Sequence, residues 1–263
     1  AASFRHRLGG VPGDLPAPDL SCRFAAGRGV LEAIEECRKM NVLCIHANPR
    51  DGGFVHGSLD AVASCLRERG ASVRPLHLRN EGILDCTGCF ACLRTGACVL
   101  DDSMEAICRS MRDADGYVVG GSVRNGHVTA LYKRLLERIT YPLIFTGDLT
   151  GKMVLSVSAV GKMGGKRATR KLLGLDGTGA YHVGHLFFRT DIPTRLTVDA
   201  VRRRLERAAD QFLDRFRAEW RPGPLWHAAR RVDRFIMKRR LFAGNPELYR
   251  HVIECYRRRG WMR

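Results

Sequence analysis

Four cysteines fall within one short segment of the sequence, at Cys86, Cys89, Cys92 and Cys98. Their spacing is C-x2-C-x2-C-x5-C, and thiolates are soft ligands that suit iron–sulfur clusters, zinc or copper(I). Structural zinc sites more often use two well-separated C-x2-C pairs. The segment therefore predicts a metal or cluster site, and the crowding of the first three cysteines favours a cluster.

The first three cysteines resemble the start of the cluster-binding run of bacterial ferredoxins. In that run the fourth cysteine often serves another cluster, but this sequence holds no second set. We therefore expect Cys98 to complete the same site, with the bend made at Thr95 and Gly96. Zinc, and a set of free or redox-active thiols, remain the alternatives.

The composition fits an α/β protein with one sizeable core. The chain has 263 residues, 45% of them hydrophobic, whereas disulfide scaffolds belong to short secreted chains. We therefore expect a reducing, cytoplasmic compartment. No apolar run approaches the ~20 residues of a membrane helix, and residues 1–29 lack a signal-peptide pattern. We expect neither a membrane span nor a cleaved leader.

The net charge of +17 is concentrated near the end of the sequence, where residues 195–263 hold 19 Lys and Arg against 8 Asp and Glu. Such a surface attracts nucleic acid, anionic lipid or acidic proteins. No aromatic-interleaved RNA-binding motif accompanies the charge. We therefore favour a solvated, Arg-rich helical surface, and a nucleic-acid partner is not expected.

Hydrophobic patterning predicts strands that alternate with helices. This alternation indicates a parallel sheet covered on both faces, and five strands suit the doubly wound, flavodoxin-like order 2-1-3-4-5. The predicted strands are 41–47, 71–78, 116–120, 152–159 and 181–188, and the predicted helices are 30–40, 57–69, 103–113, 128–139, 165–173 and 198–220.

Composition also divides the chain into three parts. Residues 1–40 read as an N-terminal extension whose first part is a Gly/Pro/Ala-rich arm. Residues 41–221 form the predicted flavodoxin-like domain, with the cysteine segment as an insertion at 79–103. After a break rich in Pro and Gly, residues 222–263 form a basic helical tail.

Three polar, glycine-bearing loops follow the first, third and fourth predicted strands, at 48–56, 121–126 and 158–165. In an open parallel sheet, ligands bind at the carboxyl ends of the strands. Gly52 and Gly53 allow backbone N–H groups to approach a phosphate at a helix N-terminus, and Arg50 adds charge. The three loops together predict a site for a flat ring with a phosphate tail. A G-x-G-x-x-G dinucleotide motif is absent after the first strand.

With these motifs, residues 41–190 resemble the iron–sulfur flavoprotein branch of the NAD(P)H-dependent FMN reductase family. The family's S-P-R-x-x-G-N-T loop corresponds to residues 48–55 and its compact cysteine motif to 86–98. Its D-D-M-like, G-S-P-V-Y-x-G and G-x-x-G-G segments correspond to 101–104, 120–126 and 161–165. The Tyr256 and Gly260-Trp261 region also resembles the ends of some members.

The resemblance implies bound FMN and a [4Fe–4S] cluster held by the four cysteines. It also implies a homodimer or homotetramer in which flavin and cluster approach each other across subunits. No acid–base residue is nominated, although His127 and Lys162 are polar candidates nearby. The implied FMN-binding residues are Asn48, Arg50, Gly53, Phe54, Val55, His56, Ser122, Val123, Arg124, Asn125, Gly126, Ala159, Gly161, Gly164 and Gly165.

The sequence departs from the family pattern in both flavin loops. Phe54 and Val55 replace the family's Asn-Thr pair, which removes two side-chain phosphate donors. Ser122 and Arg124 replace its Pro and Tyr. A cation at Arg124 beside the flavin ring would favour the reduced, anionic flavin.

The main functional hypothesis is a redox flavoprotein that transfers electrons between FMN and a [4Fe–4S] cluster. Its electron donor would be NAD(P)H or a ferredoxin-like protein, and its acceptor a small molecule or a protein. One alternative is a cluster-free NAD(P)H-dependent FMN or quinone reductase. Another is a flavodoxin-like binding module with zinc in the cysteine site.

Overall fold

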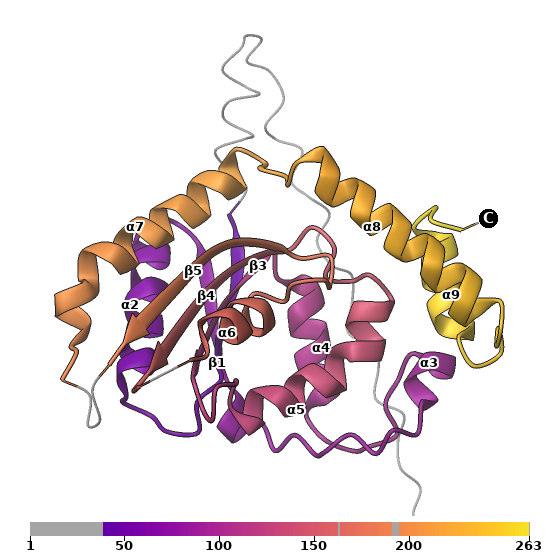
Figure 1. Ribbon diagram of the computed structural model, residues 1–263, viewed down its shortest axis with the longest axis horizontal. Helices are drawn as coiled ribbons and strands as arrows, with labels where there is room; N and C mark the ends of the chain where they lie inside the picture. The colour runs from indigo at the N-terminus through magenta and orange to yellow at the C-terminus, as the bar shows by residue number, and fades with distance from the viewer. Residues whose placement is uncertain (1–38, 163, 191–194, 263) are drawn as a thin grey trace, which may run out of the picture. The chain divides into compact units, whose positions relative to one another are not determined.

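Five parallel strands form one sheet in the order β2-β1-β3-β4-β5, as drawn in Figure 1. The computed structural model describes residues 39–162, 164–190 and 195–262. The predicted strand order and flavodoxin-like fold are confirmed, while the predicted arm and most of the helix at 30–40 lie outside the described residues. The strands are β1 (Asn41–His46), β2 (Ser72–His77), β3 (Gly116–Ser122), β4 (Met153–Val160) and β5 (Tyr181–Arg189).

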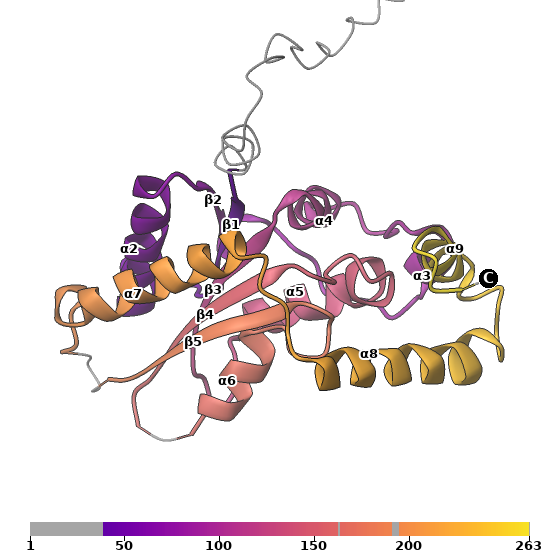
Figure 2. The same cartoon turned by 90° about the horizontal axis from the view of Figure 1, so that it is seen from above.

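Helices cover both faces of the sheet because the central strands are apolar on both sides. One face packs against α4 (Met104–Asp113), α5 (Ala130–Ile139) and α6 (Lys166–Leu173). The other face packs against α2 (Phe54–Glu68) and α7 (Val198–Arg217). Figure 2 shows α7 and α6 on opposite sides of β5. This two-layered burial is what a doubly wound parallel sheet requires.

The basic tail builds a third hydrophobic core away from the sheet. It consists of α8 (Pro224–Met237), the π-helical η3 (Lys238–Phe242) and α9 (Arg250–Arg258). Phe242, Val252 and Tyr256 of the tail enclose a leucine of the cysteine segment, Leu93, which is 1% exposed. The predicted helical C-terminal extension is therefore present, and it is packed onto the cysteine segment.

Ionic and aromatic contacts attach the end of the tail to the sheet domain. Asp148 accepts from Arg112 of α4 at 2.7 Å and also pairs with Arg259. Trp261 lies against Gly147, where a Cβ atom would come within 2.4 Å of the indole ring. Among the described residues, no helix combines the length and the apolar character needed to cross a membrane.

Two local elements differ from the predicted pattern. The cysteine segment, predicted as a loop, contains one short helix, α3 (Ala91–Thr95). After α5 the chain continues as a π-helical segment, η2 (Thr140–Phe145), which contains Pro142. A proline has no N–H for a regular helical bond, and wider turns of this type relieve the mismatch. A short 3-10 turn, η1 (Leu78–Asn80), follows β2.

A buried polar network joins β4 to β5. The Ser156 hydroxyl lies 2.7 Å from Nδ1 of His185 and 3.0 Å from Nε2 of His182, and Ser158 lies 3.3 Å from Nε2 of His185. The pKa of His185 is lowered to about 4. The largest cause is burial, and the neighbouring charges of His182, Arg170 and Lys166 also contribute. The imidazole is therefore neutral in the folded protein near neutral pH.

This network predicts an acid-sensitive contribution to stability. The pKa of His185 is 6.5 without the fold and about 4 within it. Between these values the unfolded chain binds a proton that the native state does not. The free energy of unfolding should fall as the pH drops through this window, by at most about 1.4 kcal/mol per pH unit from this group.

His185→Gln should flatten that slope in urea-denaturation series, because it removes the titrating group and keeps hydrogen-bonding capacity. His127→Gln, at an exposed position, is the matched control and should keep the wild-type slope. An unchanged slope in His185→Gln would contradict this assignment.

Candidate functional site

The first predicted loop brings backbone rather than side-chain donors to the carboxyl edge of the sheet. Gly53 precedes α2, and no side chain caps the free N–H groups of the helix. The ring of Phe54 packs edge-on against Phe188 of β5, with centroids 5.1 Å apart. Val55 is buried in the same core. The two residues that replace Asn-Thr therefore serve packing, and the loop offers an anion its main-chain N–H groups.

The third predicted loop is a tight two-residue turn. Arg124 and His127 exchange backbone hydrogen bonds of 2.8 and 2.9 Å. Asn125 and Gly126 between them have φ of 46° and 75°. Two consecutive positive φ values define a type I′ turn, for which Asn-Gly is the preferred sequence. The turn holds the exposed residues 124–127 beyond the end of β3.

The side chain of Asn48 ties the first loop to the third. Its Oδ1 atom accepts the N–H of Ser122 at 2.8 Å. Thr129, which caps α5, donates its hydroxyl to the carbonyl of Ala47 at 2.5 Å. Asn48 thus positions the two loops relative to each other, while its amide nitrogen is the group left to contact a ligand.

The third and fourth loops are in direct contact. The N–H of Val123 donates to the carbonyl of Ala159 at 2.8 Å. A Cβ atom at Gly165 would lie 2.6 Å from the methyl carbons of Val123, and one at Gly164 would lie 4.0 Å from Cα of Gly126. Gly165 permits an approach to Val123 that a side chain would prevent, whereas the contact at Gly164 is an ordinary van der Waals distance. The structure therefore gathers all three predicted loops at one edge.

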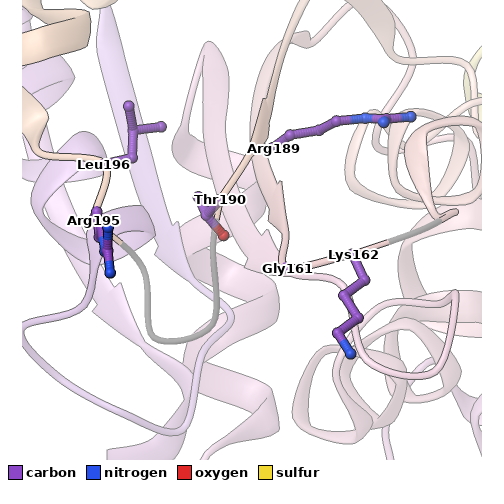
Figure 3. A pocket seen from close by; sticks show the side chains of 6 residues that line it. All are labelled: Gly161, Lys162, Arg189, Thr190, Arg195 and Leu196. Atoms are coloured by element: carbon purple, nitrogen blue, oxygen red, sulfur yellow. The ribbon is translucent and has the colours of Figure 1, made fainter.

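A basic pocket of about 430 Å³ continues this edge beyond β4 and β5. Figure 3 shows Lys162 and Arg195 flanking Thr190, with Arg189 extending away from them. Lys162 was predicted as a nearby polar residue, whereas Arg189 and Arg195 were not singled out. The sequence feature that could have identified these two arginines is their position close to the end of the fifth predicted strand. Gly161 and Leu196 complete the lining.

The cysteine motif surrounds the short helix α3. Phe90 adopts a left-handed conformation, with φ 59° and ψ 12°, just before the helix. Cys86, Cys89 and Cys98 are exposed and Cys92 is half-buried. The thiols of the motif therefore lie at or near the surface, while the tail packs against α3.

The four thiols share one electrostatic neighbourhood. The pKa of the Cys92 thiol is raised to about 11, mainly by burial and also by the negative charges of Cys98, Cys89 and Cys86. A backbone hydrogen bond from Ala91 lowers the pKa of the exposed Cys89 thiol. Cys92 therefore interacts electrostatically with the other three cysteines of the motif.

A buried ion pair fixes both ends of this motif. Arg138 of α5 donates to both carboxylate oxygens of Asp102, at 2.6 and 3.0 Å, and to the carbonyl of Leu84 at 2.7 Å. Its Nη2 atom also lies 3.4 Å from Sγ of Cys98. The side chains of Arg138 and Asp102 are only 2% and 3% exposed.

Asp102 is held as an anion by donors from three elements. Burial alone would raise its pKa, but Arg138 and the N–H groups of Leu84 and Met104 lower it overall. The N–H of Leu84 lies 2.9 Å from the carboxylate, and that of Met104 lies 3.0 Å from it. The same carboxylate thus anchors the start of the cysteine segment and begins α4.

The predicted flavin loops and the predicted cluster motif lie apart within one chain. In Figures 1 and 2 the carboxyl ends of β4 and β5 lie at the end of the described body opposite α3. α3 lies beside α9, consistent with the packing of Leu93 against the tail.

Comparison with known proteins gives a family-level match. Residues 40–189 match the model of a family described as NADPH-dependent FMN reductase. An iron–sulfur flavoprotein from Methanosarcina thermophila is 33% identical over 99 residues, which is 38% of this chain and 52% of that protein. One from Methanocaldococcus jannaschii is 32% identical over 136 residues, 49% of this chain and 67% of that protein. The chain thus spans about half the length of the Methanosarcina relative.

Solved structures with this fold include redox flavoenzymes of low sequence identity. An NAD(P)H:quinone oxidoreductase from Methanothermobacter marburgensis has a TM-score of 0.53 and 16% identity, covering 65% of this chain and 95% of that chain. A flavone reductase has a TM-score of 0.52 and 18% identity, covering 67% of this chain and 62% of that chain. At such identities the likeness concerns the fold.

The buried pair predicts a large effect of Arg138 on stability. Arg138→Met should lower the free energy of unfolding by ~3–5 kcal/mol, because Asp102 would remain buried without its partner. Arg134→Met is the matched control on the same helix. Its pair with Asp85 is exposed, so its loss should cost ~0–1 kcal/mol. Urea denaturation measures the free energy of unfolding of both variants. Equal losses would show that the buried Arg138–Asp102 pair contributes no more to stability than the exposed pair does.

Proposed function

Because this chain belongs to the NADPH-dependent FMN reductase family through residues 40–189, we propose that it is an FMN-dependent oxidoreductase with a [4Fe–4S] cluster. Cys86, Cys89, Cys92 and Cys98 would hold the cluster. The observation that carries the proposal is the family match over residues 40–189, supported by four cysteines in and around one short helix, with Cys86, Cys89 and Cys98 exposed and Cys92 half-buried.

The main-chain N–H groups of the first loop support the proposal that the FMN phosphate binds there. The N–H groups at the start of α2 are free of a side-chain cap, and Gly52 and Gly53 have open space where a side chain would otherwise stand. Helix N-termini with such access suit a phosphate group. Arg50 is exposed on the same loop and would add charge.

The third and fourth loops support the proposal that the flavin ring binds beside them. The Asn125-Gly126 turn and Val123 would contact one side of the ring, with Gly161, Gly164 and Gly165 closing the other. Arg124 is exposed at the start of that turn, where its cation would stabilise negative charge on a reduced ring.

The cysteine motif is suited to hold a preformed inorganic core. Its helix is fixed by the buried Leu93, and its ends are fixed by Arg138 and Asp102. Arg138 also donates to Sγ of Cys98 at 3.4 Å, which places a charged hydrogen-bond donor beside that sulfur. When bound, FMN would supply two-electron and the cluster one-electron chemistry.

The basic pocket supports an anionic electron donor. Lys162, Arg189 and Arg195 would attract the phosphates of NAD(P)H or the acidic surface of a ferredoxin-like protein. The acceptor would be a small molecule or a protein. The separation of the two centres within one chain favours a homodimer or homotetramer in which they approach across copies. The exposed thiols suit a reducing cytoplasm.

Anaerobic purification tests the cofactor assignment. The wild-type protein should carry flavin absorbance, with about four iron and four sulfide per chain. Cys98→Ser should lose most of the iron and keep the flavin, since the two sites lie apart. Cys65→Ser, at a buried cysteine of α2, is the matched control and should keep both. Flavin without iron would instead select the cluster-free reductase, and stoichiometric zinc without flavin would select the binding module.

Gly165→Ala tests the flavin site separately from the cluster. The new methyl group would push Val123 out of its place, so affinity for FMN should fall roughly tenfold, or ~1.4 kcal/mol. Fluorescence titration of flavin-depleted protein with FMN measures this. Gly151→Ala shares the positive φ, 85°, but its Cβ would meet open space. Equal affinities in the two variants would refute the role of this loop contact.

A further inference from the structure

Three histidines converge at the edge of the sheet where β1 and β2 end. His46 and His77 are register partners at the ends of these strands, and His56 lies in the first turn of α2. One ring nitrogen from each residue lies within 4.8 Å of the other two. The rings of His46 and His77 stack with centroids 4.2 Å apart, and those of His46 and His56 are 4.6 Å apart.

His46 is buried in an incomplete environment. The residue is 3% exposed, and its Nδ1 is the single buried side-chain nitrogen or oxygen atom without a hydrogen-bond partner in the described part of the chain. Buried polar atoms are nearly always paired with protein, water or an ion. The unpaired nitrogen is therefore an independent indication that a group belongs in this cluster.

Carboxylates border the cluster on its exposed side. Asp60 lies 3.3 Å from Nε2 of His56 and 3.7 Å from Nε2 of His46. Asp51 lies 3.9 Å from Nδ1 of His56, but it is already paired with Arg79 at 2.6 Å. Histidine ligands commonly have such carboxylates beside them, which orient the ring and increase its basicity. Asp60 is therefore the carboxylate available to the cluster.

We propose that His46, His56 and His77 form a binding site for a divalent transition-metal ion of the zinc class, with Asp60 as its fourth ligand or orienting carboxylate. Three imidazoles select zinc, cobalt, nickel or copper over magnesium and calcium, which prefer oxygen. Nitrogens on one tetrahedral zinc ion lie about 3.3 Å apart. Side-chain rotations are enough to bring atoms already within 4.8 Å to that spacing.

This site is distinct from the cysteine motif in its donors and its position. It uses nitrogen donors from β1, β2 and α2, whereas the motif uses sulfur donors around α3. The two sites can therefore be separated by the atoms that surround the metal. Zinc–nitrogen bonds are about 2.0–2.1 Å long and zinc–sulfur bonds about 2.3 Å.

Titration of the chelator-treated, full-length protein with Zn²⁺ alone tests the proposal. Calorimetry should report one Zn²⁺ per chain at this site, and zinc-edge X-ray absorption should show a shell at the zinc–nitrogen distance. His56→Gln and His77→Gln should each weaken this binding at least about tenfold. His227→Gln, a histidine of α8 outside the cluster, is the matched control and should bind as the wild type does.

Thermal unfolding provides a second measurement. Zn²⁺ should raise the Tm of the wild type and of His227→Gln, but not that of His77→Gln. A shell of sulfur alone, or unchanged affinity in both cluster variants, would overturn the proposal. The buried His46 is left intact so that folding is preserved. Flavin and iron content of the same samples report separately on the function proposed above.

Discussion

The buried pairing of Arg138 with Asp102 is the constraint on which the cysteine segment depends. Removing two charges from water is costly, and the cost is offset only where every donor and acceptor is satisfied. Here the guanidinium contacts the carboxylate, the Leu84 carbonyl and the Cys98 thiol, while the carboxylate also accepts two N–H groups. The pair is thereby a junction between α5, α4 and both ends of an otherwise irregular segment.

The opposite edge of the molecule is organised by close backbone approach instead. Asn48 joins the first and third loops through one amide, and Gly165 of the fourth loop leaves room for Val123. The loss of the family's Asn-Thr pair is compatible with this arrangement. Phe54 and Val55 strengthen the core beneath the loop, while the main-chain N–H groups at the start of α2, which no side chain caps, do not depend on side-chain identity.

Much of the fold could be predicted because it follows from local periodicity and general topological rules. Apolar runs such as residues 41–47 and 152–159 identified buried strands, and right-handed crossovers restricted their order. The packing of Leu93 against Val252 and Tyr256 could not be predicted, since it joins segments far apart in the sequence. The same holds for the inward side chain of Phe54 and for the meeting of His46, His56 and His77, which requires strand register as well as strand identity.

The packing of α9 on α3 also orders events in time. A chain is made from its N-terminus, and elements fold as their partners emerge. Leu93 is synthesised long before Val252 and Tyr256, so the helix that bears Cys92 lacks its hydrophobic support through most of translation. Completion of the third core then fixes α3, so that ordering of the cysteine segment belongs to the late stage of folding.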